Sequence, residues 1–179
     1  MQRKRKAGFK MRVLVDSSTL IALARIGKID LLRTVFKEIF ITTAIRQEIL
    51  KEESPDSEAF KEAIDQWIWV IDYKGNPGEL RKYGLGSGEA SLFLAAQPHD
   101  RLILDEANAR RFAESKGLMF TGLIGLIVAA VKTKIITGKD ALGTINKLAT
   151  GDFRISTELY LWAREEIENV SNYFRAGHT

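Results

Sequence analysis

Four acidic side chains stand at positions from which a folded chain could bring them together. Asp16 and Asp105 each follow a short apolar run, where a buried strand would end. Glu48 lies inside a segment with helical spacing, and Glu89 lies in the first turn of a helix that follows a glycine-rich stretch. If all four faced one cleft, the chain would carry a concentrated group of carboxylates.

Such a group would repel itself unless cations neutralise it or the pKa values of its members shift. Two divalent ions, about 3.5–4 Å apart, can activate a water and stabilise the leaving oxygen in phosphodiester hydrolysis. This chemistry requires hard oxygen ligands and neither histidine nor cysteine. The chain has no cysteine and only two histidines, so one or two Mg²⁺ or Mn²⁺ ions are the expected cofactor.

Each acid also has a purely structural explanation. Asp16 and Asp105 could cap helices after their strands, which is a common role for aspartate. Glu48 could face solvent, the more frequent outcome for a single helical glutamate, and Glu89 could stabilise a helix N-terminus through the helix dipole. Spacing alone leaves a shared metal site and four separate structural roles open.

The elements that must position these acids follow from the apolar pattern. Short apolar runs predict strands at residues 11–15, 39–41, 67–73, 102–104 and 118–120. Segments with helical spacing separate these runs and continue to the end of the chain, whereas residues 74–87 are predicted to form a glycine-rich loop. The alternation predicts an α/β fold with a mostly parallel central sheet of four to five strands flanked by helices. Sites form beyond the carboxyl ends of such strands, so Asp16 and Asp105 should meet at one edge.

The predicted organisation is a basic N-terminal extension at residues 1–10 and a single domain with C-terminal helices at residues 11–179. The composition, 45% hydrophobic and 28% charged, is that of a globular protein large enough for one core. The longest apolar run, residues 123–131, is too short to span a bilayer, and no secretory signal precedes Asp16. A cytoplasmic protein without a membrane partner is therefore expected.

The net charge of +4 is concentrated at the start of the chain. Six of the 27 lysines and arginines precede Asp16, which leaves the rest slightly acidic. A basic arm of this kind can grip nucleic-acid phosphates. A solubilising tail, or translation that begins at Met11, would explain the same pattern.

Four short motifs carry a family resemblance. In chain order they are VLVDSS at residues 13–18, IRQE at 45–48, GSGEA at 86–90 and LILDE at 102–106. Their order resembles that of PIN-domain nucleases, and especially the PIN subgroup related to VapC toxins. The resemblance covers about residues 11–163, and three longer segments strengthen it: LIALARIGKIDLL at 20–32, TGLIGLIVAAVK at 121–132 and FRISTELY at 153–160.

The resemblance implies a PIN-like fold and a metal-dependent ribonuclease. Its catalytic and metal-binding acids would be Asp16, Glu48, Glu89 and Asp105. A hydroxyl beside the first acid of the family is matched by Ser18.

Three further positions receive weaker assignments. Many relatives carry aspartate where this chain has Glu106, so a role for Glu106 as a metal ligand, direct or through water, stays open. Arg110 and Arg111 are candidates for contacts with RNA phosphates, because their helix starts directly after Asp105. The alternative for both arginines is a solvated helix face.

The leading hypothesis is an Mg²⁺- or Mn²⁺-dependent endoribonuclease that is the toxin of a toxin–antitoxin pair. Hydrolysis of single-stranded RNA would leave a 3′-hydroxyl and a 5′-phosphate. The resemblance further implies a homodimer and a small antitoxin that blocks the site. The alternatives are a catalytically inactive PIN-like module that binds nucleic acid or regulates, and a phosphatase that acts on small phosphoesters.

Overall fold

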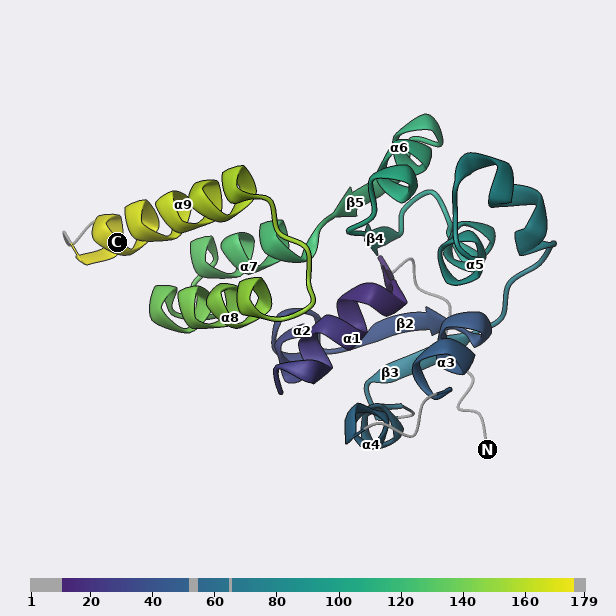
Figure 1. The fold of residues 1–179 in the computed structure, drawn as a ribbon, viewed down its shortest axis with the longest axis horizontal. Coiled ribbons are helices and arrows are strands. Elements are labelled where there is room, and N and C mark those ends of the chain that lie inside the picture. Colours follow the sequence, from purple (N-terminus) through teal and green to yellow (C-terminus); the bar gives the residue numbers. More distant parts are fainter. Residues whose placement is uncertain (1–10, 52–54, 65, 176–179) are drawn as a thin grey trace.

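A five-stranded sheet forms the centre of the computed structural model, which describes residues 11–51, 55–64 and 66–175 (Figure 1). The order of the strands is β3-β2-β1-β4-β5, and every pair is parallel. The strands are β1 (Val13–Val15), β2 (Ile39–Thr42), β3 (Ile68–Ile71), β4 (Arg101–Ile103) and β5 (Met119–Thr121). The predicted α/β class with a parallel sheet is confirmed, with five strands. The basic extension predicted at residues 1–10 lies outside the described residues.

Helices connect the strands and follow the last one. Between β1 and β4 the chain forms α1 (Ser17–Arg25), α2 (Asp30–Phe36), α3 (Thr43–Ile49), α4 (Pro55–Ala63), the 3₁₀ helix η1 (Pro77–Tyr83) and α5 (Ser87–Ala95). Between β4 and β5, and after β5, it forms α6 (Ala107–Ser115), α7 (Leu123–Lys132), α8 (Gly138–Thr150) and α9 (Thr157–Arg175). Within the described residues, no helix is both long and apolar enough to span a membrane.

The helix η1 lies in the segment that was predicted to be a loop, so that prediction was wrong for residues 77–83. Asn76 caps this helix, because its side chain accepts a hydrogen bond from the backbone N–H of Gly78 at 2.9 Å. Pro77 at the first position has the φ that a helix start needs. Gly84 ends the helix with φ of 75°, in the left-handed region that favours glycine. The same proline and glycines that suggested a loop therefore start and end a short helix.

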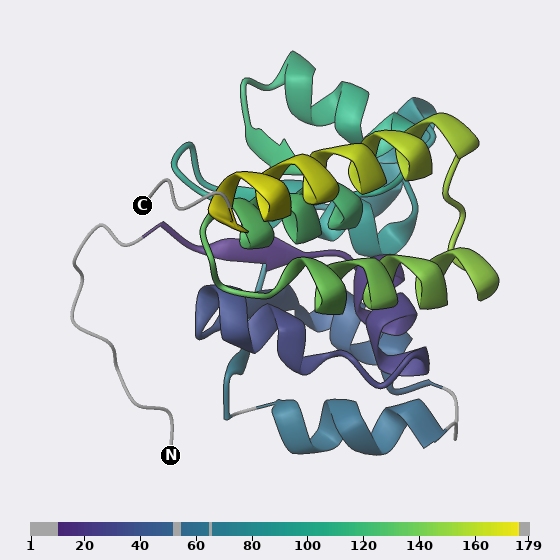
Figure 2. The same ribbon diagram turned by 90° about the vertical axis from the view of Figure 1, so that its left-hand side faces the viewer.

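Strand β1 is covered on both faces. Successive strand side chains point to opposite faces, yet Val13, Leu14 and Val15 are all buried. Figures 1 and 2 show helices packed around the sheet. This double burial is the reason that the strand reads as a continuous apolar run instead of an alternating one.

The last three helices pack against one another, and Figure 2 shows them side by side. Helix α7 contributes most of its apolar side chains to the core, as expected for residues 123–131. Polar contacts join the group at its surface. Lys132 of α7 forms an ion pair with Glu166 of α9, and the hydroxyl of Tyr160 in α9 donates to Oδ1 of Asn146 in α8 at 2.8 Å.

The direction of the sheet reverses at β1. The chain proceeds outward from β1 through β2 and β3, and then returns to place β4 on the other side of β1. In open α/β sheets, ligand sites form beyond the carboxyl ends of the strands at such a reversal. Asp16 follows β1 directly and Asp105 follows β4 by two residues, so both lie at this point.

Candidate active site at the carboxyl ends of β1 and β4

Asp16 is buried, with 1% of its surface exposed, and caps helix α1. Its Oδ1 accepts a hydrogen bond from the backbone N–H of Thr19 at 3.0 Å, and its Oδ2 accepts one from the hydroxyl of Ser18 at 2.9 Å. Its own N–H donates to the carbonyl of Ile103 in β4 at 3.3 Å. Burial raises the pKa of this carboxyl, because the charged form loses contact with water. The predicted capping role is confirmed, and it holds a carboxylate rigidly at the sheet edge.

Asp105 approaches Asp16 from the neighbouring strand. Its Oδ2 accepts a hydrogen bond from the hydroxyl of Thr19 at 2.8 Å, so the fully buried Thr19 contacts both aspartates. Its Oδ1 accepts one from the backbone N–H of Leu123 at 3.0 Å. Burial, and then the negative charge of Asp16, raise the pKa of Asp105 to about 6. The two aspartates therefore behave as one electrostatic unit.

The helix that Asp105 caps is not the one that follows it. The N-cap residue of α6 is Glu106, whose side chain makes no capping hydrogen bond. Asp105 instead satisfies the first N–H of α7, far along the chain. Asp105 therefore does cap a helix, as the structural alternative predicted, but the helix is α7 and not the one that follows its strand.

Arg110 turns back onto the loop that carries Asp105. Its Nε donates to the carbonyl of Leu104 at 3.1 Å, and one Nη donates to the carbonyl of Asp105 at 2.8 Å and lies 3.5 Å from Oδ1 of the same residue. Arg111 is exposed and donates to Oδ1 of Asn108 at 2.6 Å. Arg110 therefore supports the aspartate loop, and contact of either arginine with RNA stays a prediction.

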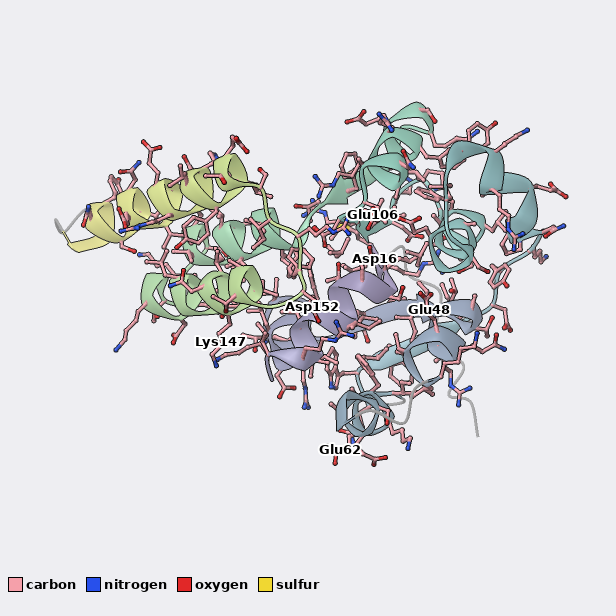
Figure 3. The ribbon with its side chains drawn as sticks, in the orientation of Figure 1. Asp16, Glu48, Glu62, Glu106, Lys147 and Asp152 are labelled. Carbon is pink, nitrogen blue, oxygen red and sulfur yellow. The ribbon has the colours of Figure 1, made fainter. Side chains whose placement is uncertain are left out.

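A pocket of about 300 Å³ opens beside Asp16, and we call it the carboxylate pocket. Its acidic lining residues are Asp16, Glu48, Glu89 and Glu106. Figure 3 shows Glu48 on α3 and Glu106 at the start of α6, with Asp16 between them, whereas Glu62 on α4 lies far away. Acids from four separate segments of the chain are thus gathered around one hollow.

Glu89 has one carboxylate oxygen without a partner. Its Oε2 accepts a hydrogen bond from the backbone N–H of Gly86 at 2.9 Å, whereas its Oε1 is buried and has no hydrogen-bond partner among the described residues. Burial, and then the charges of Asp16, Glu106 and Glu48, raise the pKa of Glu89. A buried acceptor without a donor is costly, so this oxygen is suited to a cation.

Gly88 leaves the space into which Glu48 reaches. A Cβ atom at this position would lie 2.6 Å from Oε2 of Glu48 and 3.3 Å from Cγ1 of Ile45. Nearby, the hydroxyls of Thr42 and Ser91 lie 2.5 Å apart and join the cap of α3 to α5. The glycine in the GSGEA motif therefore sets how closely Glu48 approaches the first turn of α5.

The donor set fits a hard divalent cation, because it consists of carboxylates and hydroxyls and includes the unpaired oxygen of Glu89. However, no three histidine, cysteine or acidic side chains of the described residues are arranged to hold one ion together. Asp105 lines an adjoining cleft instead of the carboxylate pocket. Glu48 and Glu106 are exposed, whereas hydrogen bonds hold the carboxylates of Asp16 and Asp105. The charges of neighbouring acids contribute to the raised pKa values of Glu89 and Asp105, which shows that the acids lie close together.

The structure therefore brings Asp16, Glu48 and Glu89 to one pocket and links Asp105 to Asp16 through a threonine. Sequence reasoning placed Ser18 beside the first acid but missed Thr19. The position of Thr19, three residues after a capping aspartate, signals only the backbone bond to that aspartate. Its hydroxyl contact with Asp105 depends on the pairing of β1 with β4.

In a comparison with known families, a family model described as a PIN domain matches residues 12–169. No curated protein and no solved structure matches the chain. PIN domains are generally nucleases that use divalent metal ions. The matched region contains the whole sheet and every acid of the site, and the predicted PIN-like fold is confirmed. The chain belongs to the PIN-domain family.

Proposed function

We propose that this protein is an endoribonuclease that depends on Mg²⁺ or Mn²⁺. The observation that carries the proposal is the pair formed by the buried Asp16 and the partly buried Asp105, bridged by Thr19, at the edge of a pocket that also holds Glu48 and Glu89. Burial raises the pKa values of Asp16, Glu89 and Asp105, and the charges of neighbouring acids raise those of Glu89 and Asp105 further. Such an arrangement stores an electrostatic cost that a divalent cation would relieve.

In this proposal, Asp16, Glu48, Glu89 and Asp105 would hold one or two ions, and Glu106 would be an additional ligand, direct or through water. Divalent ions held there would supply the chemistry for phosphodiester hydrolysis, by activating a water and compensating charge on the leaving oxygen, and the products would carry a 3′-hydroxyl and a 5′-phosphate. Hydrogen bonds from Ser18 and Thr19 keep the aspartates in place. Arg110 holds the aspartate loop through two backbone carbonyls.

We further propose that the chain is the toxin of a toxin–antitoxin pair and cuts single-stranded RNA. This assignment, like the proposed homodimer and the small antitoxin that would block the site, rests on the resemblance of the ordered motifs to the VapC-related PIN subgroup. A coding sequence for a small protein directly beside this one, and co-purification of the two products as one complex, would support the assignment. A product that binds neither a neighbouring protein nor a second copy would contradict it.

A catalytically inactive module that binds nucleic acid is the second candidate. Two observations favour it: Glu106 stands where many relatives carry aspartate, and no three acids of the described residues are arranged to hold one ion. The presence of all four principal acids favours the nuclease. If no cleavage is observed, a direct measurement of metal binding tells whether the folded protein still binds the ion.

The test is cleavage of a labelled single-stranded RNA in Mn²⁺ by the wild type, Asp16→Asn and Glu62→Gln. Glu62 is an exposed acid on α4, distant from the pocket, and provides the matched control (Figure 3). We expect Asp16→Asn to lower kcat by more than about 100-fold, beyond the ~10–100-fold typical of residues that only support a metal ligand, and Glu62→Gln to have no effect. Cleavage that survives Asp16→Asn would refute the proposed site. Calorimetric Mn²⁺ binding without RNA cleavage would favour the binding module, and turnover of an aryl phosphate would favour a phosphatase.

A further inference from the structure

A second hollow, of about 530 Å³, adjoins the carboxylate pocket, and we call it the α1–α9 cleft. It lies between α1 and the segment that joins α8 to α9. Ser18 and Glu106 line both hollows, and Asp105 lines the cleft. Figure 3 shows Asp152, from the segment between α8 and α9, close to α1. The cleft has the size of a small-molecule site and opens directly next to the acids.

The cleft contains basic side chains, which the carboxylate pocket lacks, beside its three acids Asp105, Glu106 and Asp152. Two arginines line it, Arg25 from α1 and Arg154 from the segment before α9. Arg25 donates to Oδ2 of Asp152 at 2.8 Å, which ties the two walls together. Arg154 is exposed and makes no hydrogen bond or ion pair with the rest of the described chain. Its guanidinium is therefore available to an anion that enters the cleft.

The remaining lining of the cleft is mostly apolar. Ile21, Ile26, Leu148 and Phe153 contribute to it, and Phe153 is half-buried against the core. Grooves for single-stranded nucleic acid combine cations that track the backbone with apolar or aromatic surface for the bases. The cleft offers this combination a short distance from the proposed metal ligands.

A strand of RNA that approaches the carboxylates meets repulsion from several acids at once. A cation supplied by the protein, on the side away from the metal site, would offset part of this repulsion. Arg110 and Arg111 are poorly placed for this task, because one holds the aspartate loop and the other donates to Asn108. Arg154 has no hydrogen-bond or ion-pair partner among the residues that the structure describes, so it has no comparable structural role.

We propose that Arg154 binds a backbone phosphate of the RNA strand that runs from the carboxylate pocket into the α1–α9 cleft. The inference rests on the proposed nuclease function. It assigns a purpose to the FRISTELY segment, whose first two residues, Phe153 and Arg154, line the cleft. The substrate class is single-stranded nucleic acid, read through its phosphates and not through its bases.

The test compares wild type, Arg154→Ala, Arg154→Lys and Arg164→Ala. Arg164 lies on α9, is exposed and is paired with Glu168, so it serves as a matched arginine outside the cleft. Fluorescence anisotropy with a labelled single-stranded RNA in EDTA measures binding without cleavage. We expect Arg154→Ala to weaken binding about 10-fold and to reduce the slope of log K against log salt concentration by about 0.7, the value for one phosphate contact. Arg154→Lys should retain most of the binding, and in Mn²⁺ the loss should appear in KM with kcat nearly unchanged.

Several outcomes would overturn the inference. These are RNA binding and KM of Arg154→Ala within twofold of wild type, an equal loss in Arg164→Ala, or no RNA binding by wild type. Cleavage that depends on Asp16 but is insensitive to Arg154 would sink this inference and leave the proposed function intact. Binding that depends on Arg154, with no cleavage in Mn²⁺, would contradict the proposed nuclease function and leave the role of Arg154 in RNA binding intact. Circular dichroism of Arg154→Ala checks that this exposed substitution leaves the fold unchanged.

Discussion

The carboxylate pocket and the α1–α9 cleft share Ser18 and Glu106, but they differ in charge and in how their side chains are held. The pocket is lined by four acids and by no basic residue, whereas the cleft combines two arginines with three acids and an apolar surface. The acids nearest the sheet are held by hydrogen bonds from buried neighbours, whereas Arg154 is exposed and unpaired within the described residues. The ends of β1 and β4 thus position the aspartates proposed for catalysis, whereas the segment between α8 and α9 supplies the arginine proposed to bind the substrate.

This difference leads to a separation of effects. Substitutions that disturb Asp16, Asp105 or their neighbours should change metal affinity, kcat or the free energy of unfolding, because hydrogen bonds and burial constrain these two aspartates. Substitution of the exposed Arg154 should change RNA affinity and leave stability unchanged. Three variants test the separation.

The largest effect is expected from Thr19→Val. Valine has nearly the same shape but removes the hydroxyl that donates to Oδ2 of Asp105, so a mostly buried carboxylate loses a donor. We expect kcat in Mn²⁺ to fall about 10- to 100-fold, as for other partners of metal ligands, with RNA binding in EDTA within twofold of wild type. Thr144→Val is the matched control, since Thr144 is a buried threonine of α8 whose hydroxyl bonds only to the carbonyl of Asp140. Equal losses of kcat and RNA binding in Thr19→Val would contradict the proposal that the carboxylate pocket serves catalysis and the cleft serves RNA binding.

A smaller effect is expected from Gly88→Ala. The new methyl group would displace the flexible end of Glu48, which is a cheap adjustment, and would press on Ile45. We expect Mn²⁺ affinity to fall about 10-fold, in the range for disturbed metal ligation, when calorimetry compares it with Gly143→Ala. Gly143 is a helical glycine of α8 with no atom near its added Cβ, so that control should keep its metal affinity. Unchanged affinity in Gly88→Ala would remove Glu48 from the proposed ligands.

The smallest effect concerns stability without metal. Because the pKa of Asp105 is raised to about 6, the folded state binds more protons than the unfolded state between about pH 4 and 6. Stability from this group is therefore lost as pH rises through that range, by about 1–3 kcal/mol in all. Asp105→Asn removes this loss, so in EDTA at pH 7.5 its melting temperature should exceed that of wild type by a few degrees.

The measurement is thermal unfolding in EDTA at pH 4.5 and pH 7.5. The advantage of Asp105→Asn should shrink at the lower pH, where the native aspartate is largely protonated. Arg154→Ala should match wild type at both values. A variant that is less stable than wild type at pH 7.5 would show that the hydrogen bonds of Asp105 outweigh its electrostatic cost.

Much of the framework could be predicted from local pattern. Strands buried on both faces read as short apolar runs, and the acids that follow β1 and β4 were expected at one edge because parallel strands align their carboxyl ends. Helix η1 was missed because its proline and glycines are also the residues of loops.

The contacts between distant segments could not be read in this way. The bond from Leu123 to Asp105 depends on how β4 and β5 pair, and the return of Arg110 onto Leu104 depends on the angle at which α6 leaves the sheet. Arg154 lies far along the chain from every acid of the pocket, and only the packing of the last helices brings it to the cleft. Local spacing contains no information on such placements.

The capping of α7 by Asp105 has a consequence for the resting state of the site. The positive end of the helix macrodipole, equivalent to roughly half an elementary charge, faces Oδ1 of this aspartate. Helix α7 packs against α8 and α9 and buries most of its apolar side chains, and this packing orients the dipole toward Asp105. The C-terminal third of the protein contributes no acid to the pocket, yet it acts as a permanent partial counterion for the carboxylate that ends the β4 segment.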